Sequence, residues 1–240
     1  MVASQSVRGI DADPDVTGAG RPFSVLRLLV LVFAAAVVVS LVRVFLVQTF
    51  VIPSGSMQPT LDVGDRVVVS RLDYRFGDVQ RGDVIVFNGD GVFDPPRAPA
   101  RSGLVELGRT VADTLGVPVG EKDYVKRVIG LPGDRVVCCD AAKRITVNGV
   151  PLDERYVLTG DAPSEVSFDI RVAPGRLWVM GDHRSDSGDS RDHLGDPGGG
   201  TVPLDQVVGR VVSVWWPLSR AEGIGRVDAV GTAGPAGGSP

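Results

Sequence analysis

The sequence predicts a mostly β protein preceded by a single N-terminal transmembrane helix. An apolar segment over residues 23–47 predicts the helix, and short Val- and Ile-rich runs after residue 56, bounded by Gly, Pro and Asp, predict the strands. Between two such runs stands Asn148-Gly149, a dipeptide typical of two-residue β-hairpin turns. The strands are therefore expected to connect in an antiparallel manner.

Residues 1–22 are polar and are predicted to form a disordered tail. The apolar segment 23–47 that follows is long enough for a bilayer span, which needs about 20 apolar residues. Arg27 and Arg43 lie near its ends, where their side chains can reach the membrane interfaces. A cleavable signal peptide or a buried core helix would have a shorter apolar run, and residues 50–53 form a poor cleavage site. We therefore expect a retained anchor.

The orientation of this anchor follows from the positions of the basic residues. Arg8, Arg21 and Arg27 lie on its N-terminal side, whereas no basic residue stands between Arg43 and Arg66. The positive-inside rule predicts a single-pass protein of the cell membrane, with a cytoplasmic N-terminus and an extracytoplasmic remainder. The lipid bilayer is thus an expected partner. The net charge of -4 gives no indication of nucleic-acid binding.

Residues 48–220 are predicted to form the β-domain. Its expected strands cover residues 66–71, 83–87, 124–129, 135–139, 145–147, 166–170, 176–180 and 207–215.

Two segments differ from the β-rich pattern. Residues 88–123 read as an insertion, in which Leu104, Leu107, Val111 and Leu115 have the spacing of one helix face. Such a helix would either pack on the sheets or lie on the membrane surface. Residues 221–240 are rich in Gly, Ala and Pro, which predicts a disordered C-terminal tail.

Cys138 and Cys139 are adjacent, and the chain has no other cysteine. No Cys/His spacing suitable for a metal is present. Because a bridge between neighbouring residues is strained, we expect free thiols. An extracytoplasmic location would favour a disulfide between them.

The candidate nucleophile is Ser56, in the turn formed by residues 53–61. Prolines bracket this turn and Gly55 precedes the serine, which suits presentation of a hydroxyl on rigid backbone. A serine nucleophile needs a base, and the chain offers Lys126 or one of its two histidines, His183 and His193. Burial would lower the pKa of a lysine enough for this role. A turn-forming serine and a surface lysine are the alternatives.

The loop from Asp182 to His193 is dense in acidic residues. It does not fit an EF-hand, because Arg184 stands at the third position and no Glu stands at the twelfth. Clustered His or Cys ligands for zinc are also lacking. We therefore expect no metal and no cofactor, and interpret the segment as a hydrogen-bonded loop in which Asp–Arg pairs hold a serine in place.

Four segments together resemble the conserved boxes of type I signal peptidases. They are Pro53 to Leu61, Arg81 to Phe87, Tyr124 to Asp134 and Gly181 to Arg191, in the family's order and behind an N-terminal anchor. The resemblance implies a signal-peptidase type of β-domain and a serine–lysine endopeptidase that removes signal peptides from exported preproteins. Those preproteins would be its partners, and no obligate protein partner is evident.

The resemblance also implies a role for individual residues. Ser56 would be the nucleophile and Lys126 the general base, while the Ser54 hydroxyl and the Ser56 N–H would stabilise the oxyanion. Ser187 would orient Lys126. Structural support would come from Asp182, Asp189 and Arg191.

The chain departs from the family's pattern at three positions. His183 stands where Asn is usual, and Ser185-Asp186 replaces Asp-Asn. Other interpretations are a self-cleaving repressor-like or transfer peptidase, and a membrane-anchored β-domain that binds peptides without cutting them. The anchor argues against the repressor, and the presence of both Ser56 and Lys126 argues against the inactive domain.

Overall fold

The computed structural model describes residues 25, 27–35, 47–95 and 123–227. The chain divides into two compact units, Met1–Val39 and Ser40–Pro240. In the first unit, residues 27–35 are helical. Among the described residues no helix has both the length and the apolar character that a bilayer crossing requires. The predicted tail 1–22 and the helix expected over residues 104–115 lie outside the described residues.

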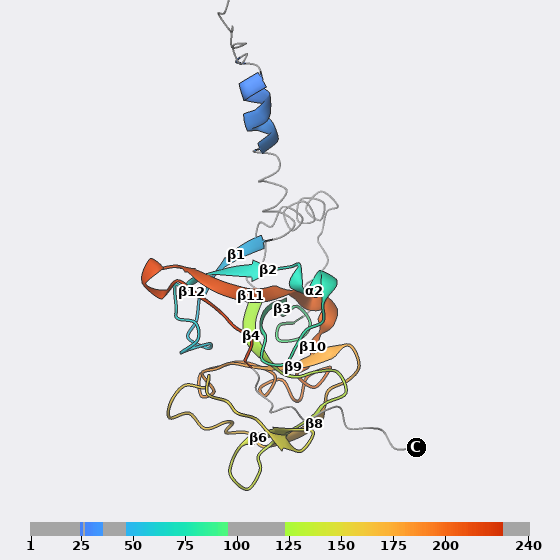
Figure 1. Cartoon of the computed structure of the whole chain (residues 1–240). Helices are drawn as coiled ribbons and strands as arrows, with labels where there is room; N and C mark the ends of the chain where they lie inside the picture. The colour runs from blue at the N-terminus through green and yellow to red at the C-terminus, as the bar shows by residue number, and fades with distance from the viewer. Residues whose placement is uncertain (1–24, 26, 36–46, 96–122, 228–240) are drawn as a thin grey trace, which may run out of the picture. The chain divides into compact units, whose positions relative to one another are not determined.

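A large antiparallel sheet dominates the second unit (Figure 1). Its strands follow the order β1-β2-β11-β3-β4-β9-β10, and β12 pairs with β11. Their bounds are β1 Val47–Val51, β2 Arg66–Ser70, β3 Val84–Asn88, β4 Asp123–Gly130, β9 Arg176–Met180, β10 Val202–Pro203, β11 Val207–Trp216 and β12 Glu222–Gly223. Among the residues described, three short helices accompany the sheet: α2 Asp73–Phe76, η1 Leu204–Gln206 and η2 Leu218–Arg220.

Apolar side chains cover both faces of this sheet. Along β2 the buried residues alternate with more exposed ones, as Val67 and Val69 show, because successive side chains of a strand point to opposite faces. One cluster contains Ile52, Met57 and Leu61 from the segment after β1. A second cluster lies around Ile85, Phe87, Val128 and Val179. The segment that carries Ser56 is therefore packed into the core on either side of the serine.

A smaller sheet has the strand order β7-β6-β5-β8, with β5 Arg135–Cys138, β6 Ile145–Val147, β7 Val150–Pro151 and β8 Phe168–Arg171. The chain enters this sheet from β4 and leaves it into β9 (Figure 1). Asn148 and Gly149 join β6 to β7 with φ angles of 52° and 80°, the positive values that a type I′ turn requires.

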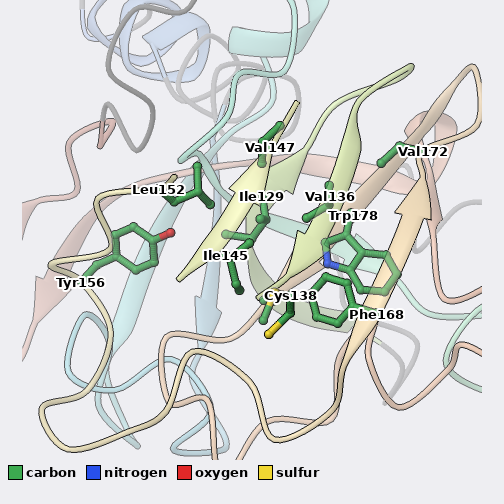
Figure 2. Packing of buried hydrophobic residues seen from close by; sticks show 11 residues of the cluster. Ile129, Val136, Cys138, Ile145, Val147, Leu152, Tyr156, Phe168, Val172 and Trp178 are labelled. Atoms are coloured by element: carbon green, nitrogen blue, oxygen red, sulfur yellow. The ribbon is translucent and has the colours of Figure 1, made fainter. Parts of the chain in front are cut away.

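The core under the small sheet is closed at both ends by aromatic side chains. Figure 2 shows Trp178 beside Phe168 at one end and Tyr156 with Leu152 at the other. The ring centroids of Phe168 and Trp178 lie 5.1 Å apart.

The expectation of free thiols is wrong, since Cys138 and Cys139 form a disulfide. Neighbouring side chains within a strand point to opposite faces, which would keep the two sulfur atoms apart. Strand β5 ends at Cys138, so Cys139 is released from that alternation. A bridge between the neighbours thereby becomes possible.

The main strands match the predicted ones, and antiparallel pairing is confirmed. The structure adds β1, which starts at Val47, the last residue of the predicted anchor, and runs to Val51. It also places residues 222–227, expected in the C-terminal tail, against the β-domain. There Ile224 joins the core and Arg226 forms an ion pair with Asp83.

Candidate active site

The turn that carries Ser56 is held by buried neighbours. Ile52, Met57 and Leu61 are at most 2% exposed, and the Gln58 N–H donates to the Gly55 carbonyl at 3.0 Å. The Ser56 side chain is left half-buried. A short segment of this kind presents a hydroxyl at a fixed position, because its apolar side chains hold the backbone on both sides.

Lys126 lies on β4, between β3 and β9. Its side chain is 3% exposed, and its Nζ donates a hydrogen bond to the Ser56 Oγ at 2.6 Å. Burial disfavours the ammonium form and is the main reason that the pKa of Lys126 falls to about 8; Asp189 opposes the shift and Arg191 assists it. Of the three basic residues considered from the sequence, Lys126 is the one that contacts Ser56 through its side chain.

Arg127 points away from Lys126 and forms a buried ion pair with Asp182, which we call the Arg127–Asp182 lock. Its Nε and Nη2 atoms donate to the two carboxylate oxygens of Asp182 at 2.8 and 2.6 Å. The Thr60 hydroxyl donates to the same carboxylate at 2.5 Å. The ring of Tyr156 lies 4.2 Å from the guanidinium carbon, which adds a cation–π contact. This lock joins β4, the Ser56 segment and the Asp-rich loop at one point.

Asp189 and Arg191 form a second buried pair, with Nε–Oδ1 and Nη2–Oδ2 distances of 2.9 and 2.8 Å. Burial opposes ionisation of Asp189, but the Arg191 guanidinium and the N–H groups of Gly181 and Arg191 hold the pKa of its carboxyl below the ordinary value. The Ser187 hydroxyl donates to Asp189 at 2.9 Å. Within the described residues Ser187 makes no hydrogen bond to Lys126, the group that the resemblance assigns it to orient.

The remaining predicted oxyanion donor, Ser54, is exposed. Its hydroxyl donates to the Ser56 Oγ at 3.3 Å. The structure therefore brings Ser54, Ser56 and Lys126 together. Of the loop residues, Asp182 binds Arg127, whereas Ser187, Asp189 and Arg191 bind one another.

The acidic loop uses its carboxylates internally. Asp182 binds Arg127, Asp189 binds Arg191, and Asp192 accepts the N–H of Asp189. Among the described residues no group of three His, Cys, Asp or Glu side chains is arranged to hold a metal ion.

Sequence reasoning missed the roles of several residues that shape the site: Thr60, Arg127, Tyr156 and Arg184. His183, considered from the sequence as a base, instead contacts the Gly55 carbonyl. Arg127 had a usable signal, because an arginine in an apolar strand needs an acidic partner and the Asp-rich loop offers several. His193, by contrast, lies away from Ser56 and stacks on Phe93 with ring centroids 4.4 Å apart.

A serine hydroxyl bonded to a buried lysine amine, on an antiparallel β scaffold, fits the class of serine hydrolases that use lysine as their base. Comparison with known proteins identifies the family within this class. The family model described as signal peptidase, peptidase S26, matches residues 25–216. The chain therefore belongs to the signal peptidase family, and the resemblance seen in the sequence is confirmed.

Relatives found by sequence agree with this assignment. The chain is 40% identical over 215 residues to the probable signal peptidase I of Mycobacterium leprae (strain TN), covering 77% of this chain and 74% of that relative. It is 34% identical over 200 residues to the signal peptidase I of Bacillus caldolyticus, covering 78% and 90%. A crystal structure of a signal peptidase I from Enterococcus faecalis V583 aligns with 25% identity and a TM-score of 0.34, covering 56% of this chain and 97% of that chain.

Proposed function

We propose that this chain is a signal peptidase I, a serine endopeptidase that cuts N-terminal signal peptides from exported preproteins. The observation that carries the proposal is the 2.6 Å contact between Lys126 Nζ and Ser56 Oγ inside a member of the signal peptidase family. Ser56 is the proposed nucleophile and Lys126 the proposed general base.

The proposed reaction begins with Lys126 in its neutral form. The amine accepts the Ser56 hydroxyl proton as Oγ attacks the scissile carbonyl, and a tetrahedral intermediate forms. The resulting ammonium then donates a proton to the leaving amine. In the second half of the cycle Lys126 activates a water molecule that hydrolyses the acyl-enzyme. Burial supports this role, because it lowers the pKa of Lys126 to about 8.

The developing oxyanion needs hydrogen-bond donors. The Ser56 N–H and the Ser54 hydroxyl are the proposed donors, and the 3.3 Å distance between the two serine oxygens supports the second of them. Ser187, Asp182, Asp189 and Arg191 act in this proposal as support: Asp182 fixes Arg127 beside Lys126, and the Asp189–Arg191 pair shapes the loop behind it.

The location of the enzyme is part of the proposal. Residues 23–47 would anchor the chain in the cell membrane with the N-terminus in the cytoplasm and the β-domain outside. The apolar composition of the segment supports the anchor, and so does the exposure of the helical side chains Leu28 to Phe33, each more than half exposed in the chain by itself. A signal peptide embedded in the same bilayer would present its cleavage site near Ser56.

The test is direct cleavage. Purified full-length protein in detergent or lipid vesicles is incubated with an exported preprotein, and the products are identified by mass spectrometry. We expect a single cut after a small residue at the end of the signal peptide, and no cut with Ser56→Ala protein. Failure of the wild-type protein to cut, or cutting by Ser56→Ala at the wild-type rate, would overturn the proposal.

A further inference from the structure

His183 contacts the backbone of the nucleophile turn at two successive carbonyls. Its N–H donates to the Ser56 carbonyl at 3.2 Å, and its Nδ1 lies 3.3 Å from the Gly55 carbonyl oxygen. A carbonyl oxygen only accepts hydrogen bonds, so Nδ1 must carry the proton in this contact. The donor is present in the neutral Nδ1–H tautomer and in the imidazolium alike.

The loop approaches the nucleophile so closely that it leaves no room for a side chain at Gly181. A Cβ built there would collide with the Ser56 carbonyl oxygen and with the Ser187 side chain. The neighbouring Asp182 is fixed by its two hydrogen bonds to Arg127. The backbone on the N-terminal side of His183 is therefore fixed, and it holds His183 against the turn.

The Gly55 carbonyl belongs to the same peptide unit as the Ser56 N–H. That peptide bond is trans, so the C=O and the N–H point in opposite directions from one plane. The Gly55 oxygen is held by two donors, the His183 Nδ1–H and the Gln58 N–H. Fixing the oxygen in this way turns the Ser56 N–H toward the other side. Within the described residues that N–H donates to no protein group and stays available for a ligand.

We propose that His183 is a positioning residue: its Nδ1–H orients the peptide unit whose N–H stabilises the oxyanion. The inference rests on the proposed function, since it assigns a second partner to the same nucleophile turn. It also assigns His183 a role other than that of the base, because the His183 ring contacts backbone whereas Lys126 contacts the Ser56 hydroxyl.

Asparagine and glutamine variants separate this role from a general effect on the loop. The Nδ2 atom of Asn is bonded to Cγ, as is the Nδ1 atom of His, so His183→Asn returns a donor at the same distance from the backbone. His183→Gln moves the donor one methylene further out, and His183→Ala removes it. His193→Ala is the matched control, because this second histidine of the loop binds Asp196 and Phe93 instead.

The experiment measures kcat and KM for one preprotein with the full-length protein in vesicles, together with thermal unfolding of each variant. We expect kcat to fall about 3- to 10-fold in His183→Ala and His183→Gln, the effect of losing one neutral hydrogen bond, with KM unchanged. His183→Asn should recover most of that loss, and His193→Ala should match the wild type.

An unchanged kcat in His183→Ala would overturn the inference. So would a loss of kcat in His183→Ala that follows a lower unfolding midpoint and that His183→Asn does not rescue. The proposed function is judged separately: if wild-type protein cuts and Ser56→Ala does not, that function stands whatever the His183 variants do.

Discussion

Lys126 and Arg127 are neighbours on one strand, yet their side chains lie in different surroundings and differ in their ability to lose a proton. Within the part of the chain that the structure describes, the Nζ of Lys126 bonds to one group, the Ser56 hydroxyl, and burial lowers the pKa of Lys126 to about 8. Arg127 meets a carboxylate that it binds through two nitrogens, and a guanidinium stays charged in any case. The alternation of side chains along β4 keeps these two environments apart.

The serine hydroxyls give the first prediction at the residue scale. Ser56→Ala should abolish cleavage and leave the unfolding midpoint nearly unchanged, since it removes one half-buried hydroxyl from a turn. Ser54→Ala should lower kcat by about 10²–10³-fold, as expected for the loss of an oxyanion donor. Initial rates on one preprotein, with circular dichroism as the folding control, check both. A Ser54→Ala enzyme with full kcat would remove Ser54 from the oxyanion site.

Lys126 gives the second prediction, a dependence of the rate on pH. Only the neutral amine accepts a proton, so kcat/KM should rise with pH and level off above a pKa of about 8. Lys126→Arg keeps the charge but cannot deprotonate, and should lose at least about 10²-fold in kcat, as Lys126→Ala does. Rate profiles between pH 5 and 10 measure both effects. A profile that levels off near the ordinary pKa of histidine, about 6.5, would contradict a lysine base.

The same group makes stability depend on pH with a defined sign. The folded-state pKa of Lys126 lies below its ordinary value of 10.5, so the unfolded chain binds more protons between about 8 and 10.5. In that window the contribution of Lys126 to the free energy of unfolding rises as the pH increases. At neutral pH the protein therefore carries an ammonium group at some cost to its stability.

At the scale of elements, the Arg127–Asp182 lock connects strand β4 to the loop before Arg191. Removing one partner of a buried ion pair leaves an uncompensated charge, which costs about 3–5 kcal/mol. Asp182→Ala should therefore lower the free energy of unfolding by that amount and reduce activity as the loop moves away from Ser56. Arg135–Asp169 is the matched exposed pair, with side chains 58% and 51% exposed. Asp169→Ala should cost less than about 1 kcal/mol.

Denaturant unfolding of the two variants side by side tests this prediction. Equal losses in Asp182→Ala and Asp169→Ala would show that burial of the first pair does not matter.

The sequence predicted the strands well where local pattern decides them. Residues 145–147 and 176–180 form strands within the predicted bounds, because alternating or buried apolar runs and a clear turn signal mark their ends. Strand β1 was missed because it is short and directly follows the apolar run, with no Gly, Pro or Asp to mark its start. Strands β10 and β12 are too short to leave a pattern.

The site was predicted in part. The resemblance pointed to Ser56 and Lys126, but His183 and Thr60 find their partners more than a hundred residues away. Tyr156 contacts Arg127 from a turn outside the sheet. No local pattern encodes such partners. Ser187 binds Asp189, only two positions away, but the resemblance had assigned its hydroxyl to Lys126 instead.

At the scale of the whole molecule, the short path from the apolar segment to Ser56 gives the last prediction. A truncated chain that begins at Val47 keeps β1, whose residues pair with β2 from Val47↔Ser70 to Val51↔Arg66. It should cut a short soluble peptide at the full-length rate but process a membrane-embedded preprotein more slowly, because tethering raises the local concentration. Rates on both substrates measure this. Equal rates on the embedded preprotein would show that the first 46 residues do not matter for efficiency.

A second truncation, beginning at Ile52, is the control for the boundary. It also removes β1, and we expect a lower unfolding midpoint because β2 then becomes an unpaired edge. The comparison separates the effect of the membrane segment from that of the sheet.

The three pieces of the site are far apart along the chain: Ser56 meets Lys126 across 70 positions and Gly55 meets His183 across 128. During synthesis the chain emerges from its N-terminus, so the serine appears long before its amine partner and before the loop that holds its turn. A partly made molecule thus carries a serine without chemical activity. The contacts of Ser56 with Lys126 and of Gly55 with His183 therefore form only after the segment through Arg191 has been made and has folded.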